Sequence, residues 1–189
     1  NVASDQTPGN GAALGGVVEA NGEWVAFVSW ASNLVPADTN DRADVFVYNL
    51  EIRATERVSL GFEGVEPDAD SGVLGRLAIT PGGRYVTFLS GAANLRTVET
   101  PNCAIPDYPC VHVFVRDRER QTTTQVTNTT LPNRFSQDAP YLPTFPSLSA
   151  DGRWLAFSTF TFLCPVEPFC ADVYAVDTQN NEPFLLTQP

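Results

Sequence analysis

Short runs of alternating hydrophobic and polar residues, each opened by a tight turn, recur along this chain. The pattern is written out most fully at Glu19–Val28, Ile79–Phe88 and Ser149–Ser158. Each copy has a turn ending in glycine, one polar residue, an aromatic residue, an aliphatic residue, a small residue and phenylalanine. The turn glycine supplies a positive φ that other residues adopt only at a cost, and the alternation after it suits a strand with two different faces. Each copy therefore predicts a tight turn that feeds a β-strand.

Further strand-like runs flank each copy and divide the chain into three series of four. β-branched and aromatic residues dominate these runs, and no segment shows sustained helical periodicity. The predicted strands are 14–19, 23–30, 44–50 and 55–60, then 73–80, 84–90, 111–117 and 122–128, and last 145–149, 153–159, 172–177 and 182–187. We therefore expect an all-β chain made of three repeated units.

Each repeated unit carries an insertion. The spacing between the turn glycines exceeds the roughly 40–50 residues of common propeller repeats. The extra residues fall between the second and third strand of each unit, where Ser29–Leu34 in the first unit matches Ser90–Leu95 in the second. The individual character of each unit is therefore expected in these insertions.

The turn-and-strand copies, the loop Asn33–Asn40 and the strand Asp44–Val47 resemble the WD-like propeller repeat of bacterial TolB-type proteins. The resemblance covers nearly the whole chain. It implies a β-propeller of radial, four-stranded antiparallel blades, with the strand before each turn glycine innermost. The strands that end at Ser59, Thr127 and Thr187 are then outermost.

The expected blades are 14–60, 73–128 and 145–187 within one propeller segment, 1–189, and residues 1–13 resemble the tail of a preceding blade with its connector. Three blades are too few to close a ring, since propellers typically have 4–8. Three explanations stay open: the chain is part of a longer propeller, two copies complete a six-bladed ring, or a neighbouring chain covers the open blade faces.

Charge and hydropathy narrow the expected partners. With 11 Lys and Arg against 22 Asp and Glu, the net charge of −11 argues against binding to nucleic acid, which depends on cationic side chains. No apolar run reaches the about 20 residues that span a bilayer. No basic and apolar leader stands at Asn1, so we expect any export signal to have been removed or to lie outside this sequence.

The four cysteines fall into two local pairs, Cys103 with Cys110 and Cys164 with Cys170. Even number and close pairing predict two disulfide-closed loops and hence an oxidising, extracytoplasmic compartment. Zinc is the alternative, but neither pair has the spacing of a zinc knuckle. The single histidine, His112, alternates with two valines and is expected to be an exposed strand residue.

Asp38, Asn40 and Asp44 form the strongest candidate metal site. Oxygen donors at alternating positions of a turn suit Ca²⁺, which takes 6–8 oxygen ligands. The alternative is structural: short polar side chains cap backbone amides of the loop and fix the start of the strand. The same insertion is expected to be closed by a disulfide in the second and third units, which favours the structural role. No other cofactor is expected.

No catalytic set is evident. A Ser-His-Asp triad would have to use His112, and no Gly-x-Ser-x-Gly motif is present. The acid pairs Asp68 with Asp70 and Asp117 with Glu119 are expected to be solvated, because most acids at strand ends and in connectors are.

Two surface features complete the candidates. Asn128–Thr130 is an acceptor sequence for N-glycosylation, if the source organism glycosylates secreted proteins. Phe160 and Phe162, at the start of the third insertion, are candidates for a binding face. The aromatic residues at equivalent positions in the three units are expected to pack blade against blade: Trp24, Tyr85 and Trp154.

These observations predict a secreted or extracytoplasmic, non-enzymatic propeller that serves as a protein-interaction or assembly module. One alternative is an accessory propeller domain of a larger extracellular enzyme, either a peptidase or a glycan-active protein. The other is a carbohydrate-binding module. Because propellers host many functions, the resemblance in fold does not choose among these.

Overall fold

In the computed structural model, which describes residues 1–73, 77–97, 111–127, 142–161 and 170–187, the chain forms three four-stranded antiparallel sheets. Within each sheet the strands lie side by side in chain order, and the expected all-β architecture of three four-stranded units is confirmed. Blade one consists of β1 (Ala13–Val18), β2 (Trp24–Ser29), β3 (Asp44–Asn49) and β4 (Ala54–Arg57). Blade two consists of β5 (Ala78–Ile79), β6 (Tyr85–Ser90), β7 (His112–Asp117) and β8 (Thr122–Gln125). Blade three consists of β9 (Leu142–Leu148), β10 (Trp154–Thr161), β11 (Cys170–Asp177) and β12 (Glu182–Leu185).

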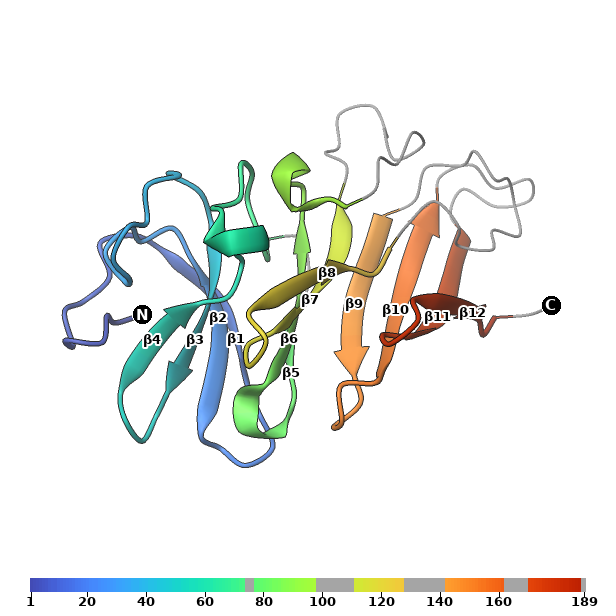
Figure 1. Cartoon of the computed structure of the whole chain (residues 1–189), viewed down its shortest axis with the longest axis horizontal. Coiled ribbons are helices and arrows are strands. Elements are labelled where there is room, and N and C mark those ends of the chain that lie inside the picture. The colour runs from blue at the N-terminus through green and yellow to red at the C-terminus, as the bar shows by residue number, and fades with distance from the viewer. Residues whose placement is uncertain (74–76, 98–110, 128–141, 162–169, 188–189) are drawn as a thin grey trace.

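The three blades stand in a row, with the two ends of the chain at opposite ends of the row (Figure 1). The first strand of each blade faces its counterparts, since β5 lies against both β1 and β9. Blade two therefore has a neighbour on each side, whereas blades one and three each have one neighbour within this chain.

The outermost strands end about three residues earlier than the sequence predicts, and side chains continue the pairing. After β4 the amide of Val58 still donates to the carbonyl of Val45 at 2.8 Å. The next bond is made by a side chain, because the amide of Val45 donates to Ser59 Oγ at 3.0 Å. Thr127 and Thr187 accept in the same way in blades two and three, at 2.9 and 3.2 Å. The residues that were expected to end the outermost strands thus bond to the third strand through their hydroxyl groups.

The core lies between the blades. One stacked pair of aromatic rings sits at the same place in each blade, with ring centroids 5.7 Å apart in every case. The pairs are Phe27 with Phe46, Phe88 with Phe114, and Phe157 with Tyr174. The pair of blade two packs on valines of blade one, and the pair of blade three packs on valines and a leucine of blade two. Burial of apolar surface between the blades is therefore the main force that holds the row together.

The first residues of the chain hold, for blade one, the place that the connector 60–68 holds for blade two. Thr55 Oγ1 donates to the carbonyl of Val2 at 2.6 Å, and Thr123 Oγ1 donates to the carbonyl of Leu60 in the same way. Further along, the Asn33 side chain bonds to Pro8 and Asn10. The corresponding Asn94 bonds to Glu66 and Asp68. The expected resemblance of this segment to an inter-blade connector is thus a resemblance in geometry as well.

Candidate functional site

A recurring contact joins each blade to the next. The aromatic residue that follows the turn in one blade packs on the turn glycine of the following blade. A Cβ atom at Gly83 would lie 2.7 Å from the ring of Trp24, and one at Gly152 would lie 2.2 Å from the ring of Tyr85. Only glycine leaves room for these rings. The predicted packing role of Trp24 and Tyr85 is therefore confirmed.

An arginine of blade two closes the first of these junctions. The guanidinium of Arg118 stacks on the Trp24 ring at 3.9 Å from its centroid, a cation–π contact. Its Nη1 donates to the carbonyl of Gly83 at 2.7 Å, and its Nη2 pairs with Glu56 Oε2 of blade one at 2.6 Å. At the second junction Thr178 replaces Arg118, and its hydroxyl donates to the carbonyl of Gly152 at 2.8 Å.

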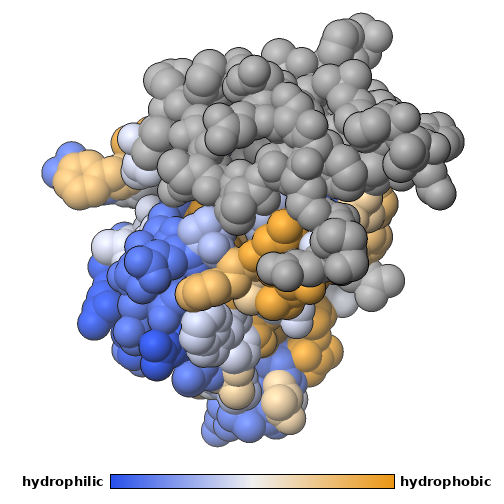
Figure 2. Space-filling model, turned by 90° about the vertical axis from the view of Figure 1, so that its right-hand side faces the viewer, coloured by the Kyte–Doolittle hydropathy of each residue, from blue (hydrophilic) through white to orange (hydrophobic). Residues whose placement is uncertain are grey.

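Blade three exposes the positions that are covered in the other two blades. Trp154 is the counterpart of Trp24 and Tyr85, yet 40% of its surface is exposed. Leu186 is 57% exposed, whereas its counterparts Val58 and Val126 are buried. Phe184, 46% exposed, lies 5.8 Å from Trp154, between ring centroids. We call Trp154, Phe184 and Leu186 the open face of blade three; Figure 2 shows hydrophobic surface on this side of the molecule.

Blade one is open on its opposite side. Nothing lies within 4 Å of a Cβ atom built at Gly22, the counterpart of Gly83 and Gly152. Leu50, the counterpart of Arg118, is 49% exposed. The face of blade one that points away from blade two also has a cavity of about 280 Å³, lined by Asn1, Val2, Ala13, Gly15, Gly16, Val25, Phe27 and Tyr48. We call Gly22, Leu50 and this cavity the open face of blade one.

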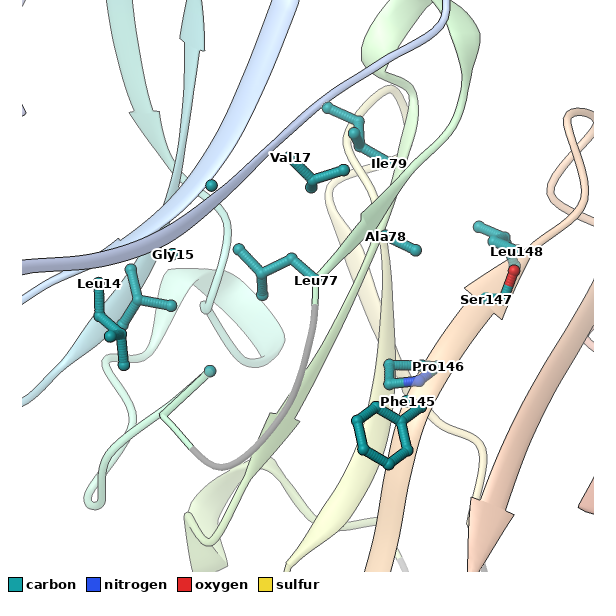
Figure 3. Close-up of a pocket in the computed structure, with 13 residues that line it drawn as sticks. Leu14, Gly15, Val17, Leu77, Ala78, Ile79, Phe145, Pro146, Ser147 and Leu148 are labelled. Carbon is teal, nitrogen blue, oxygen red and sulfur yellow. The ribbon is translucent and has the colours of Figure 1, made fainter.

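A larger, apolar pocket of about 890 Å³ lies between the innermost strands (Figure 3). β1, β5 and β9 all contribute to it, and hydrophobic side chains and glycines make up nearly all of its wall. The ring of Phe145 lies at this wall, at a bulge in β9 where its φ of 52° is unusual for a bulky residue. Gly15, with a φ of 59°, occupies the corresponding bulge in β1. No charged residue lines the pocket among the described residues.

The predicted calcium ligands Asp38 and Asp44 surround an arginine. Arg57 Nη1 lies 3.0 Å from Asp38 Oδ1, 3.3 Å from Asp44 Oδ2 and 2.7 Å from Glu66 Oε1. The side chains of Arg57, Asp38 and Asp44 are almost fully buried. Asn40 turns its amide nitrogen toward Asp44 Oδ2, at 3.0 Å, and its oxygen accepts the amide of Arg42. The guanidinium thus neutralises the carboxylates, and calcium binding, which stays a prediction, requires that Arg57 be displaced.

Burial changes the protonation of this acidic cluster. It raises the pKa of Asp38 to about 6, although Arg57 acts in the opposite direction. Burial also raises the pKa of Asp44, against hydrogen bonds from Ser59 and Asn40. Burial opposes ionisation of Glu66 as well, but hydrogen bonds from Thr39 outweigh it and lower the pKa of that carboxyl.

His112 was expected to be exposed, and this expectation is wrong. Its side chain is fully buried, and Asp44 and Asp172 at the same position in the other two blades are buried as well. Nδ1 lies 3.2 Å from Thr127 Oγ1 and 3.2 Å from Gln125 Nε2. Burial, with a smaller contribution from the charge of Arg96, lowers the pKa of His112 to about 4. The histidine takes the place that Asp44 and Asp172 take in the other blades, where each carboxylate accepts the equivalent hydroxyl.

The remaining residues singled out from the sequence lie in different surroundings. Asp117 is buried rather than solvated, because Arg84 Nη2 pairs with it at 2.9 Å at the end of β7. Phe160 is half-buried in β10. Cys170 begins β11, but its side chain, together with Cys103, Cys110, Cys164, Phe162 and Asn128, lies outside the described residues. The disulfides, the carbohydrate face and the glycan therefore stay predictions.

The described residues contain no group of three or more His, Cys, Asp or Glu side chains arranged to hold a metal ion. They also contain no helix that is long and apolar enough to cross a membrane.

Sequence reasoning missed Phe184 and Leu50. A signal was available: the position that holds Phe184 in blade three is Glu56 in blade one and Thr124 in blade two. The change from polar to aromatic at one repeated position indicates that this face of blade three differs from that of the other two blades.

Comparison with solved structures supports the fold. No protein-family model matches the sequence, and no curated protein matches it either. TolB from Agrobacterium tumefaciens is 12% identical, with a TM-score of 0.50 over 91% of this chain and 45% of its own. An oligogalacturonate lyase from Vibrio parahaemolyticus is 13% identical, with a TM-score of 0.54 over 100% of this chain and 46% of its own. Dipeptidyl peptidase 4 from Porphyromonas gingivalis is 13% identical, with a TM-score of 0.53 over 92% and 25%.

These neighbours are similar through their propeller domains. At such low identity the likeness shows the fold alone. The chain spans less than half the length of each of these three proteins. What the comparisons support is therefore a β-propeller fold of which this chain makes up three blades.

Proposed function

We propose that this chain is a propeller segment that serves as an interaction and assembly module, with no catalysis of its own. The observation that carries the proposal is the open face of blade three. Trp154 and Leu186 are exposed there, although their counterparts are covered at the two junctions inside the chain, and the exposed Phe184 lies against Trp154. A contiguous apolar surface of this kind marks a contact with another protein surface. Fold likeness to TolB is in keeping with such a module.

Capture of binding partners tests this function. The protein is immobilised and exposed to an extract of its source, beside the variants Phe184→Ser and Phe62→Ser. Phe62 lies in the connector after blade one and is 83% exposed, so the second variant removes a phenylalanine outside the open faces. We expect a stoichiometric partner that Phe184→Ser releases and Phe62→Ser retains. Equal retention by both variants, or no retained protein, would contradict the proposal.

An accessory propeller within a larger extracellular enzyme is the second candidate. The chain covers 25% of a dipeptidyl peptidase and 46% of an oligogalacturonate lyase, so propeller blades of this shape occur inside longer enzymes. In that case the surface that covers blade three belongs to the same polypeptide. The complete coding sequence tests this: a catalytic domain in frame with these blades would support it.

The extracytoplasmic location remains part of the proposal, and it depends on the two predicted cysteine pairs. Alkylation of the denatured protein with and without reductant, followed by intact mass measurement, counts the cysteines held in disulfides. Four reactive thiols without reductant would argue against an oxidising compartment.

A further inference from the structure

The two open faces lie at opposite ends of the row, and they match the two halves of a blade-to-blade junction. At each junction inside the chain, one blade contributes an aromatic ring and the next contributes a turn glycine. At the end of the row, no turn glycine of a following blade lies against the ring of Trp154 among the described residues. At its start, Gly22 has no ring against it, and a side chain of a neighbour would find open space there.

A second pair of positions distinguishes the junctions by chemistry. Between blades one and two, Glu56 of the first forms an ion pair with Arg118 of the second. Between blades two and three, the same two positions hold Thr124 and Thr178. At the ends of the row they hold Phe184 on blade three and Leu50 on blade one, both about half exposed.

The two positions therefore hold side chains of matching chemistry at each place: opposite charges at the first junction, hydroxyl groups at the second and apolar side chains at the two ends of the row. Leu50 is identified as the counterpart of Arg118 and Thr178 by its backbone. The amides of Leu50, Arg118 and Thr178 donate to the carbonyls of the residues after the turn glycine, Glu23, Arg84 and Arg153.

The exposed large hydrophobic side chains that lie on described strands belong to blades one and three. Among the described residues, no large hydrophobic side chain on a strand of blade two is exposed. On the open side of blade one, the cavity of about 280 Å³ has Val25 and Phe27 in its wall. At the junction inside the chain, the counterparts Val86 and Phe88 of blade two receive Val58 of blade one. The exposed Leu186, which is the counterpart of Val58, is the side chain that this cavity would receive.

We propose that the open face of blade three binds the open face of blade one in a second copy of this chain, so that two copies form a six-bladed ring. The proposal rests on the assembly function above and names its partner. A contact between two different faces closes when the second copy returns the same contact to the first. Six blades lie within the 4–8 blades of known propellers.

The proposal is tested by introducing the charged pair of the first junction at the two open faces. The mass of the protein in solution is measured by sedimentation equilibrium for the wild type, Phe184→Glu, Leu50→Arg and the double variant. We expect the wild type at twice 20.5 kDa and each single variant at 20.5 kDa. The double variant, which places Glu opposite Arg as in Glu56 and Arg118, is expected to return to twice that mass. Phe62→Ser, in the connector, is expected to leave the mass unchanged.

Circular dichroism of each variant checks that the strands are retained. Both substituted side chains are about half exposed, so we expect the blades to fold. A wild-type mass of one chain overturns the proposal, and so does a dimer that neither single variant dissociates or that the double variant does not restore. If the wild type is a single chain but still captures another protein through Phe184, the assembly function stands and the partner is not a second copy.

Discussion

Blade two and blade three have the same four-stranded design, but they differ in what covers them. Both faces of blade two are packed against neighbours, and its stacked rings, Phe88 and Phe114, are fully buried. Blade three is packed on one side only, and Trp154 and Phe184 remain exposed on the other. The two blades thus share one strand order and differ in how far their outer faces are covered.

The polar residue at the start of the third strand is buried in all three blades, but its chemistry differs. In blade one it is Asp44, which is fully buried and neutralised by Arg57. In blade two it is His112, fully buried and held uncharged. A carboxylate is costly to bury without a cation, and a neutral imidazole is less so. In each blade the residue at this position bonds to a hydroxyl group. In blade one a cation lies beside the charged residue, and in blade two the residue is uncharged.

We expect the largest difference in the free energy of unfolding between substitutions of a phenylalanine on a covered face and one on an open face. Phe88→Ala should lower the free energy of unfolding by about 3–5 kcal/mol, because it leaves a cavity between blades one and two. Phe184→Ala should change it by less than about 1 kcal/mol in the single chain, because that ring is 46% exposed. Urea unfolding followed by tryptophan fluorescence measures both. Equal losses would mean that blade three is already covered.

Turn glycines give a second contrast. Gly22 and Gly152 have nearly the same φ, 77° and 74°, so replacement by alanine strains the backbone equally at both. Only at Gly152 does the new Cβ also meet the ring of Tyr85. Gly152→Ala should therefore cost about 1–3 kcal/mol more than Gly22→Ala in the free energy of unfolding of the single chain. Under conditions in which copies associate, a loss of association with Gly22→Ala would indicate that a ring occupies this site.

Much of the fold follows from the repeated pattern, because the turn glycine, the aromatic residue and the phenylalanine recur at the same phase in every unit. The polar contacts were harder to foresee. Asp38 and Asp44 pair with Arg57, which lies at the end of the outermost strand of the blade. Glu66, in the connector, is the third carboxylate around this arginine. Arg57 and Glu66 are distant in sequence from Asp38, so the pattern along the loop does not reveal the cluster. Without the arginine, the remaining carboxylates resemble a calcium site.

Burial was the other quantity that the pattern did not reveal. Alternation along 111–117 indicated one exposed face, but both faces of β7 are buried, and β3 of blade one is buried almost as fully. In β12 the same alternation leaves Phe184 exposed. Alternation within one strand therefore does not show which of its faces the neighbouring segments cover.

Acidification should weaken blade two through His112. The pKa of this histidine is about 4 in the folded protein and 6.5 when unperturbed, so below pH 6.5 the unfolded chain binds the proton first. The stabilising contribution of the uncharged ring is therefore present above pH 6.5 and is lost as the pH falls toward 4. Between pH 7 and 5 the loss is about 2 kcal/mol. Thermal and urea unfolding of wild type and His112→Asn across this range should show a steeper pH dependence in the wild type, and parallel curves would refute the assignment.

Acidification should act in the opposite sense on blade one, through Asp38. Its folded pKa of about 6 lies above the ordinary value of 3.8, so as the pH falls below 6 the folded protein binds the proton first. The contribution of Asp38 to stability is thus fully present below pH 3.8 and is lost as the pH rises through 6. Between pH 7 and 5 the gain is about 1 kcal/mol, and Asp38→Asn should abolish it.

Because Asp38→Asn removes a candidate calcium ligand as well, the same pair of proteins can be heated with and without Ca²⁺ at pH 7. With Arg57 in place we expect no shift of Tm for either, and a rise confined to the wild type would show that the cation displaces the guanidinium.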